Sequence, residues 1–323
     1  MSASVLITGG AGFIGSHAVE ALLADGESVR VLDNFTTGRR ENLTGMAGSL
    51  KVIEGDIRDR ATVARAASGC DRVLHLAAIA SVTRSFDDPA ETEAVNVGGT
   101  ANVLAAAKGA GARRVVLASS CAVYGTTDAL PVAEAAVPHP ESPYAQSKLD
   151  GEALCRGACE GGKGAGRAGL DAGVLRFFNV YGPRQDPSSD YSGVIAIFMD
   201  RLAGARPCTV YGDGRQTRDF VFVKDVVAAC RAALDGPFLG AEPLNVGTGI
   251  ETSLRDVLAA LALASGREPV VQYAAAREGD IVRSRAACGR AAERLGFRAT
   301  MAFTQGLADT WSWYLGAGRA LSR

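Results

Sequence analysis

The chain has 323 residues, of which 47% are hydrophobic, and its 34 Lys and Arg residues nearly balance its 35 Asp and Glu residues. That length allows a large core, enough for one big α/β domain with a smaller companion. The formal net charge of −1 gives no sign of the basic surface that nucleic acid or an anionic membrane would need, so we expect small-molecule partners and neither a nucleic acid nor a membrane partner.

The start of the chain and its cysteines indicate where the protein works. An apolar strand is expected within a few residues of Met1, which leaves no room for a secretion signal. No apolar run reaches the length of a transmembrane helix. The seven cysteines are scattered, and the close pair Cys155 and Cys159 lacks a second pair or a histidine cluster. We therefore expect a cytoplasmic protein with reduced thiols and no metal site.

The stretch SVLITGGAGFIGSH (4–17) joins a short apolar strand to a helix expected over 13–25. Gly9, Gly12 and Gly15 follow the strand at GxxGxxG spacing. One glycine allows a sharp turn, one lets the backbone approach a pyrophosphate, and one lets helix and sheet pack closely. The stretch therefore predicts a dinucleotide whose phosphates meet the helix N-terminus, with a simple tight turn as the alternative.

A second strand, expected over 28–32, is followed at once by Asp33. A carboxylate there would accept hydrogen bonds from the adenosine ribose hydroxyls and repel a 2′-phosphate, which favours NAD over NADP. Arg39 and Arg40 follow closely and weaken that preference slightly. The alternative is that Asp33 only caps a loop.

A third strand over 50–54 precedes Asp56 and Ile57, where a side-chain acceptor and a backbone contact would meet adenine. Asp56 could instead cap a helix expected over 58–67. The fourth strand, 72–76, runs into small residues that let ribose and phosphate lie against the backbone. The expected cofactor contacts are Gly9, Gly12, Phe13, Ile14, Gly15, Asp33, Asn34, Asp56, Ile57, Leu76, Ala77 and Ala78, with Tyr144 and Lys148.

A long helix over 89–108 and a fifth strand over 113–118 continue the pattern. Strands that alternate with helices predict a parallel, doubly wound α/β sheet of the Rossmann type. A sixth strand is expected over 174–178, after a low-complexity surface loop, EGGKGAGRAG, at 160–169.

Past Asn179 the loops lengthen, and short strands alternate with helices expected at 193–204, 254–265, 290–296 and 304–315. We interpret this part as a smaller α/β substrate-binding lobe that is interleaved with the first domain by chain crossings. The predicted division is an NAD-binding domain at 1–178, which also receives part of 219–248, and a substrate lobe mainly at 179–323.

Tyr144 and Lys148 lie four residues apart on a helix expected to start after Pro143, so their side chains face the same way. An ammonium near a phenol stabilises the phenolate, and we expect it to lower the pKa of Tyr144 toward that of a general base. Lys148 could also hold the nicotinamide ribose. Ser120, after the fifth strand, could share the proton of a substrate alcohol. The alternative is an ordinary amphipathic helix.

Further motifs extend along almost the whole chain: TGGAGFIGSH at 8–17, SSCAVYG at 119–125, YAQSK at 144–148, RFFNVYGPRQ at 176–185 and YGDGRQTRDFVFVKDV at 211–226. With them the sequence resembles the extended short-chain dehydrogenases/reductases, specifically the nucleotide-sugar epimerases of the UDP-glucose 4-epimerase type. The resemblance implies that Tyr144 removes the proton of the sugar 4-hydroxyl while hydride leaves carbon 4 for NAD. The 4-keto sugar then turns and takes the hydride back on its other face, so NAD is regenerated.

The resemblance also implies contacts to the substrate. Asn179, Arg218 and Arg277 would reach the nucleotide diphosphate, which two arginines suit, and Tyr211 would stack on the base. The alternative for each arginine is a surface ion pair. The implied substrate-binding residues are Ser120, Asn179, Val194, Thr209, Tyr211, Arg218, Arg277 and Ser284.

Three positions bear on the reaction and the sugar. Related 4,6-dehydratases carry an Asp-Glu pair directly after the serine, where this chain has Cys121 and Ala122, and this disfavours dehydration. The Glu that related sugar-nucleotide decarboxylases place near this site is also absent. Ser284 stands where epimerases restricted to plain hexoses have a tyrosine, so it would leave room for an N-acetyl group at carbon 2.

We therefore expect an NAD-dependent 4-epimerase of UDP-glucose and UDP-galactose, of UDP-N-acetylglucosamine and UDP-N-acetylgalactosamine, or of both pairs. The alternatives are another nucleotide-sugar enzyme of this fold, acting on a uronic acid, a pentose or a dTDP-sugar or as a dehydratase or reductase, and a catalytically idle NAD-binding scaffold. The family likeness also implies a homodimer formed through the helices at 89–108 and 144–160.

Overall fold

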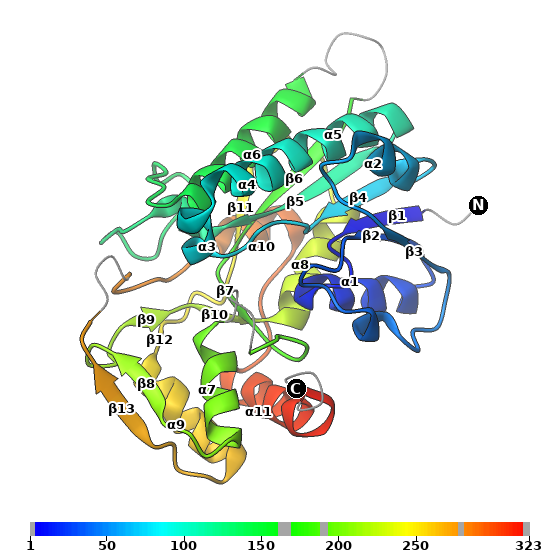
Figure 1. Ribbon diagram of the computed structural model, residues 1–323. Coiled ribbons are helices and arrows are strands. Elements are labelled where there is room, and N and C mark those ends of the chain that lie inside the picture. Colours follow the sequence, from blue (N-terminus) through cyan, green and yellow to red (C-terminus); the bar gives the residue numbers. More distant parts are fainter. Residues whose placement is uncertain (1–3, 161–168, 188–192, 277–280, 319–323) are drawn as a thin grey trace.

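A seven-stranded parallel sheet forms the centre of the protein, whose structure is a computed structural model that describes residues 4–160, 169–187, 193–276 and 281–318 (Figure 1). The strand order is β11-β6-β5-β4-β1-β2-β3, and every pair is parallel. This confirms the doubly wound sheet predicted from the sequence. The strands are β1 (Ser4–Thr8), β2 (Ser28–Asp33), β3 (Leu50–Glu54), β4 (Arg72–His75), β5 (Arg114–Ser120), β6 (Asp171–Phe177) and β11 (Pro243–Val246).

Helices cover both faces of this sheet, which explains why the middle residues of its central strands are buried and mainly apolar. On one face α1 (Phe13–Ala24) packs against α8 (Val223–Asp235). On the other face, α2 (Arg60–Ala67), α5 (Gly99–Ala110) and α6 (Pro143–Glu160) lie together (Figure 1). The seventh strand, β11, comes from late in the chain and pairs with β6.

A second group of elements has its own core, below the sheet in Figure 1. Its helices are α7 (Val194–Ala203), α9 (Leu254–Ser265) and α11 (Phe303–Trp313). The strand pairs are β7 (Asn179–Tyr181) with β10 (Phe220–Phe222), β8 (Cys208–Tyr211) with β13 (Val271–Ala274), and β9 (Thr217–Arg218) with β12 (Thr252–Ser253). Short helices α3 (Val82–Asp87), α4 (Pro89–Glu93) and α10 (Gly289–Leu295) complete the fold. The predicted two-domain division stays a prediction.

Two expected helices differ from the structure. The helix expected over 89–108 is α4, a π-helical segment Ala94–Gly98, and α5. The buried side chain of Asn96 lies in that segment, accepts from Ile79 N (2.8 Å) and donates to Ser147 Oγ (2.9 Å), which ties the bulge to α6. The helix expected from residue 58 begins at Arg60, because Asp59 caps it by accepting from Ala61 N. The alternative that Asp56 caps this helix is therefore wrong.

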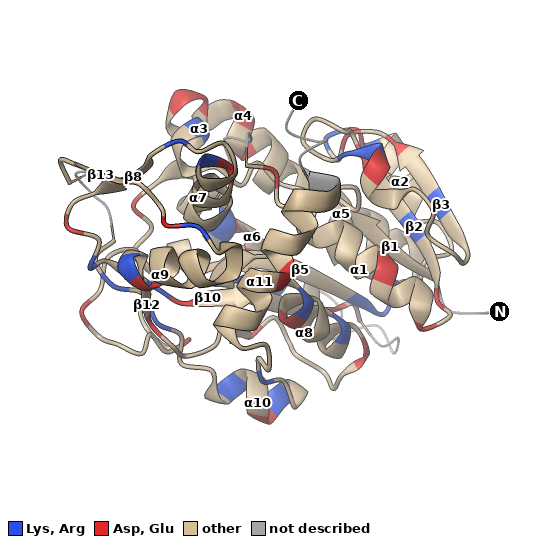
Figure 2. Cartoon of the chain, turned by 90° about the horizontal axis from the view of Figure 1, so that it is seen from below, with Lys and Arg blue, Asp and Glu red and all other residues tan. Residues whose placement is uncertain are grey.

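Charged residues of both signs are spread over the elements seen from below in Figure 2, as the nearly balanced composition requires. In the described part of the chain, no helix combines the length and the apolarity that crossing a bilayer would need.

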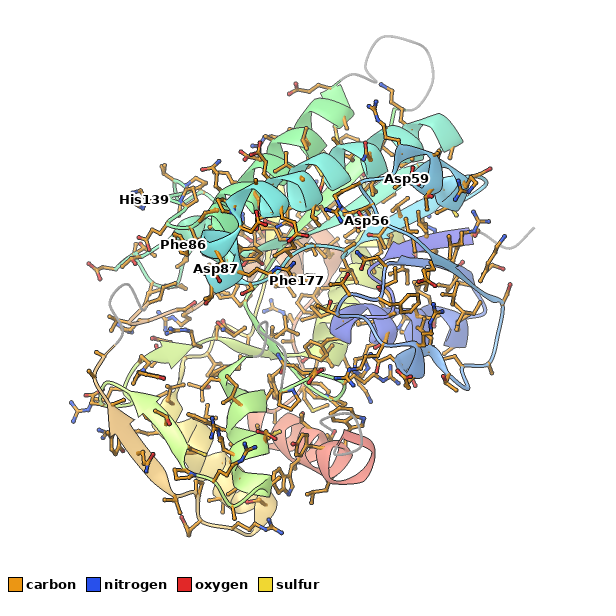
Figure 3. The ribbon with its side chains drawn as sticks, viewed as in Figure 1. Asp56, Asp59, Phe86, Asp87, His139 and Phe177 are labelled. Carbon is orange, nitrogen blue, oxygen red and sulfur yellow. The ribbon has the colours of Figure 1, made fainter. Side chains whose placement is uncertain are left out.

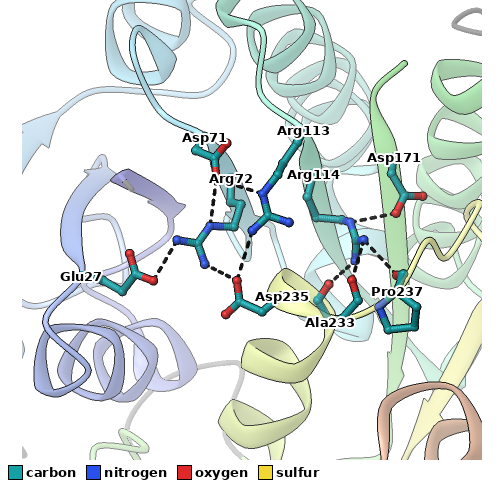
Figure 4. Close-up of polar contacts among 10 residues, drawn as sticks. Glu27, Asp71, Arg72, Arg113, Arg114, Asp171, Ala233, Asp235 and Pro237 are labelled. Carbon is teal, nitrogen blue, oxygen red and sulfur yellow. Dashed lines mark hydrogen bonds and ion pairs between the residues drawn. The ribbon is translucent and has the colours of Figure 1, made fainter. Parts of the chain in front are cut away.

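An arginine network fastens the amino ends of β4, β5 and β6 (Figure 4). Arg72 starts β4, is 2% exposed, and pairs with Glu27 (2.8 Å) and with Asp235 of α8. Arg114 starts β5, and its Nε lies 2.8 Å from Oδ2 of Asp171, the first residue of β6. The Arg114 guanidinium also donates to the Ala233 and Pro237 carbonyls at the end of α8. The network therefore links three strands to one helix.

We expect Arg114→Met to destabilise the protein by about 3–5 kcal/mol, because it leaves a buried Asp171 carboxylate without its cation. The matched control is Arg206→Met, whose half-exposed arginine pairs with Asp200 at the surface, and there we expect less than about 1 kcal/mol. Chemical denaturation followed by circular dichroism measures both. Equal losses in the two variants would show that burial of the Arg114 pair adds nothing.

Candidate functional site

A cavity of about 400 Å³ lies at the carboxyl ends of the sheet strands, where doubly wound folds bind their ligands. All the residues predicted to hold the cofactor line it: Gly9, Gly12, Phe13, Ile14, Gly15, Asp33, Asn34, Asp56, Ile57, Leu76, Ala77 and Ala78, together with Ser120, Tyr144 and Lys148. Figure 3 labels two of the lining residues, Asp56 after β3 and Phe177 at the end of β6. The individual roles stay predictions, although the structure brings the residues together.

The glycine-rich turn is closely packed. Gly9 has φ +71°, and a Cβ there would lie 2.8 Å from the backbone nitrogen of Ala77. A Cβ on Gly15 would lie 2.1 Å from the Gly9 carbonyl oxygen, so the helix could not approach the turn. Gly12 is the N-cap of α1 and offers no side-chain acceptor to the helix N–H groups. Those N–H groups therefore suit the phosphates of a dinucleotide.

The Asp33 carboxylate is 7% exposed and fixed by backbone donors. Its Oδ2 accepts from Ala11 N at 2.9 Å and its Oδ1 from Phe35 N at 2.8 Å. Burial raises the pKa of Asp33, and the two hydrogen bonds oppose that rise. Each oxygen keeps a second lone pair for a ribose hydroxyl.

The two arginines that could bind a 2′-phosphate form ion pairs with carboxylates. Arg39 pairs with Asp186, and Arg40 pairs with Glu54. The Arg40 guanidinium also lies 4.0 Å from the centroid of the Phe35 ring. Their effect on the preference for NAD is therefore smaller than the sequence alone indicates.

Asp56 is held by its neighbour Arg58, whose Nε and Nη2 donate to the carboxylate at 2.9 and 2.7 Å. Asn34 Nδ2 adds a bond of 3.2 Å. Arg58 is the main reason why the pKa of Asp56 falls to about 2. The carboxylate is thus an ionised acceptor at neutral pH, as the predicted contact to the adenine amino group requires.

Tyr144 and Lys148 face the end of β5 from the first turns of α6. Lys148 Nζ donates to the Ala118 carbonyl at 3.0 Å, and burial lowers the pKa of Lys148 to about 8. Burial raises the pKa of Tyr144 to about 12, and a side-chain hydrogen bond with Ser120 only partly opposes it. The expected lowering is therefore wrong for the protein's own side chains, since Lys148 Nζ sits 5.8 Å from the ring centroid.

Glu152 continues the same face of α6 one turn beyond Lys148, and the sequence analysis missed it. Its side chain is fully buried. Oε1 accepts from Ser119 Oγ at 2.6 Å and from Arg176 Nε at 2.8 Å, and Oε2 accepts from Arg176 Nη2 at 2.7 Å. Ser119 and Arg176 are register partners on β5 and β6. The four-residue spacing of positions 144, 148 and 152 places them on one face of the helix, and this spacing could have identified Glu152 from the sequence.

The residues predicted to bind the rest of the substrate lie in the second group of elements. Asn179 begins β7, Val194 begins α7, and Thr209 and Tyr211 belong to β8. In the described residues, Ser120 alone of the predicted substrate set lines the cavity. Ser284 is buried, and Arg277 lies outside the described residues.

Arg218, at the end of β9, donates to the carbonyls of Thr217 (2.9 Å) and Ile281 (2.5 Å). Burial raises the pKa of Cys121, directly after Ser120, to about 12, and the charge of Arg218 opposes that rise. Cys121 is thus unsuited to acid-base work at neutral pH.

Residues 5–247 match the NAD dependent epimerase/dehydratase family. The chain belongs to this family. A relative named UDP-glucose 4-epimerase, from Mycolicibacterium smegmatis, is 43% identical over 312 residues, covering 94% of this chain and 96% of the relative. Another, named UDP-N-acetyl-alpha-D-glucosaminuronate decarboxylase, from Bacillus cytotoxicus, is 36% identical and covers 80% of this chain and 78% of its own length.

Among solved structures, the UDP-N-acetylglucosamine 4-epimerase from Methanobrevibacter ruminantium M1, in complex with UDP-N-acetylmuramic acid, is 32% identical to this family member. The two superpose with a TM-score of 0.91, over 98% of this chain and 100% of the other. NAD is the cofactor of the family, and the close-packed glycine turn and the bound Asp33 carboxylate fit it.

We expect Gly15→Ala to abolish co-purification of NAD, because its Cβ forces α1 away from the Gly9 carbonyl. The matched control is Gly109→Ala on α5, where a Cβ meets open space and alanine should stabilise the helix by up to about 1 kcal/mol. NAD released by denaturation is measured per chain by chromatography. Full NAD content in Gly15→Ala would contradict the role of this close approach.

Proposed function

We propose that this family member is an NAD-dependent 4-epimerase of a UDP-sugar that works through a transient 4-keto intermediate. The observation that carries the proposal is that Ser120, Tyr144 and Lys148 share one cavity with the dinucleotide-binding residues. The residues after Ser120 are Cys121 and Ala122, so the chain lacks the acid and base that dehydration would need there. A catalytically idle scaffold that only binds NAD would not need Ser120, Tyr144 and Lys148 together.

When bound, NAD would supply the acceptor for the hydride of sugar carbon 4 and, while oxidised, a positive charge in the cavity that Tyr144 lines. The chain's own residues handle the proton. Tyr144, with a pKa near 12, keeps its proton until that charge favours the phenolate. Once Tyr144 has released its proton to solvent, Ser120 bonds the phenolate and passes the proton of the sugar 4-hydroxyl to it. Lys148 holds the ribose and adds positive charge, which weakens as the pH rises through about 8.

The nucleotide part of the substrate is assigned to the second group of elements. Asn179 and Arg218, together with Arg277, would bind the diphosphate, and Tyr211 would stack on the base. Val194 and Thr209 would complete this side of the site. The Arg218 guanidinium supports the assignment, since its charge reaches the residue after Ser120. UDP is favoured over dTDP because the two relatives described above are named for UDP-sugars.

The second candidate is decarboxylation of a UDP-uronic acid, because one relative carries that name. Such an enzyme also oxidises carbon 4 first, so the presence of Ser120, Tyr144 and Lys148 does not distinguish decarboxylation from epimerisation. The Glu expected near the serine in the decarboxylases is absent here, which favours epimerisation.

We expect the purified protein to convert UDP-galactose or UDP-N-acetylgalactosamine to the gluco epimer without added cofactor. Tyr144→Phe removes the proton acceptor and should lower the rate by at least about a hundredfold, with its NAD content unchanged. Chromatography resolves the products, and a UDP-uronic acid run in parallel detects carbon dioxide release. Decarboxylation without epimerisation would replace the proposal by the second candidate.

The sugar class is assigned to Ser284, whose small side chain would leave room for the N-acetyl group. Ser284→Tyr should slow UDP-N-acetylgalactosamine at least about tenfold more than UDP-galactose, because the larger ring occupies that room. Ser284→Ala is the matched control and should keep the ratio of the two rates. Circular dichroism checks folding, since the residue is buried. Equal rates on both sugars in Ser284→Tyr would count against this assignment.

The proposal includes a cytoplasmic homodimer. Seven free cysteines support a reducing compartment. The exposed positions of α5 and α6 include Ala101, Ala105, Ala153 and Gly157, small residues that let helices of two subunits approach. Sedimentation equilibrium measures the stoichiometry.

A further inference from the structure

The segment 183–186, which follows β7, is fastened across the start of α1. His17 Nε2 donates to the Pro183 carbonyl at 2.8 Å, and Arg184 Nη2 donates to Glu20 Oε2 at 2.8 Å. Asp186 pairs with Arg39, which follows β2. The segment thus contacts both α1 and the loop after β2. Both Arg184 and Asp186 line the cavity with Gly12.

Arg184 has two energetically unfavourable features that its contact with Glu20 does not explain. Its φ of +67° lies in the left-handed region that side chains rarely adopt. Its Nη1 is buried, and none of the described residues gives it a hydrogen-bond partner. Of the four such side-chain nitrogen atoms in the described chain, this one alone belongs to a residue of the cavity. Backbone strain and an unmet buried donor together are typical of a residue whose acceptor is a ligand.

The neighbouring groups indicate which acceptor this is. Gly12, Phe13 and Ile14 line the same cavity, and the N–H groups at the start of α1 have no side-chain cap. A helix N-terminus and a guanidinium both prefer a phosphate. The adenosine end has its own partners in Asp33 and Asp56, which leaves the diphosphate for Arg184.

We propose that Arg184 binds the diphosphate of NAD and that the 183–186 segment thereby holds the cofactor in place between turnovers. The proposal concerns the cofactor and does not depend on which sugar is converted. An epimerase regenerates its NAD within each turnover, so retention of NAD serves the proposed function.

Exchange of bound NAD for isotopically labelled NAD, followed by mass spectrometry of the holoprotein without sugar, tests the proposal. Arg184→Ala should exchange NAD about tenfold faster or more, which corresponds to about 1.4 kcal/mol. Glu20→Ala removes the contact to α1 but keeps the guanidinium, so its exchange should stay within about threefold of the wild type. Arg206→Ala, at a surface pair, is the neutral control.

Two results would overturn the proposal. One is an exchange rate for Arg184→Ala within twofold of the wild type, and the other is an equal acceleration by Glu20→Ala, which would make Arg184 a tether for α1 only. If Arg184→Ala does not fold, Arg184→Lys replaces it, because lysine keeps the positive charge but lacks the planar guanidinium. We expect Arg184→Lys to exchange NAD about threefold faster than the wild type. An unchanged exchange rate would reject the contact between Arg184 and the diphosphate. Exchange is read without sugar, so a failed epimerase assay leaves the result interpretable.

Discussion

The close approach of α1 to the first strand is the constraint on which the site depends. No side chain fits between Gly15 and the Gly9 carbonyl, or between Gly9 and Ala77. Backbone therefore meets backbone where β1 and β4 part, and the space for a dinucleotide opens beyond that point. The other residues predicted to contact the cofactor, from Asp33 to Lys148, line the same cavity as this turn.

The helix α6 then aligns the chemistry with the sheet. Lys148 bonds the Ala118 carbonyl, Glu152 bonds Ser119, and Tyr144 meets Ser120, so one helix face contacts successive residues of β5. Burial makes the tyrosine a weaker acid and the lysine a weaker base than in water. Under the proposed mechanism, the phenol of Tyr144 therefore ionises only when a positive charge, such as that of oxidised NAD, is added nearby.

Local sequence signals predicted the strands, the glycine turn and the residues that line the cavity, because each depends on neighbours in the chain. Features set by distant partners were missed. The bulge at Asn96 depends on Ile79 and Ser147, and Glu152 depends on Arg176. The position of Arg184 involves a contact with Glu20, 164 residues away.

The predicted lowering of the Tyr144 pKa was wrong for a related reason. The spacing of Tyr144 and Lys148 reveals which groups are near each other but not how far both are removed from water. Desolvation is a property of the whole fold, and here it outweighs the hydrogen bond with Ser120, the only cause that lowers the pKa of Tyr144.

The arginine network at the amino ends of the strands has a consequence for how such a protein can diverge. Arg72 and Arg114 anchor the edge of the sheet opposite the cavity. Substitutions around the ligand can then alter selectivity while the anchored edge preserves the scaffold. Laboratory evolution of this enzyme toward other sugars should accordingly tolerate many changes at the carboxyl edge and few at the amino edge.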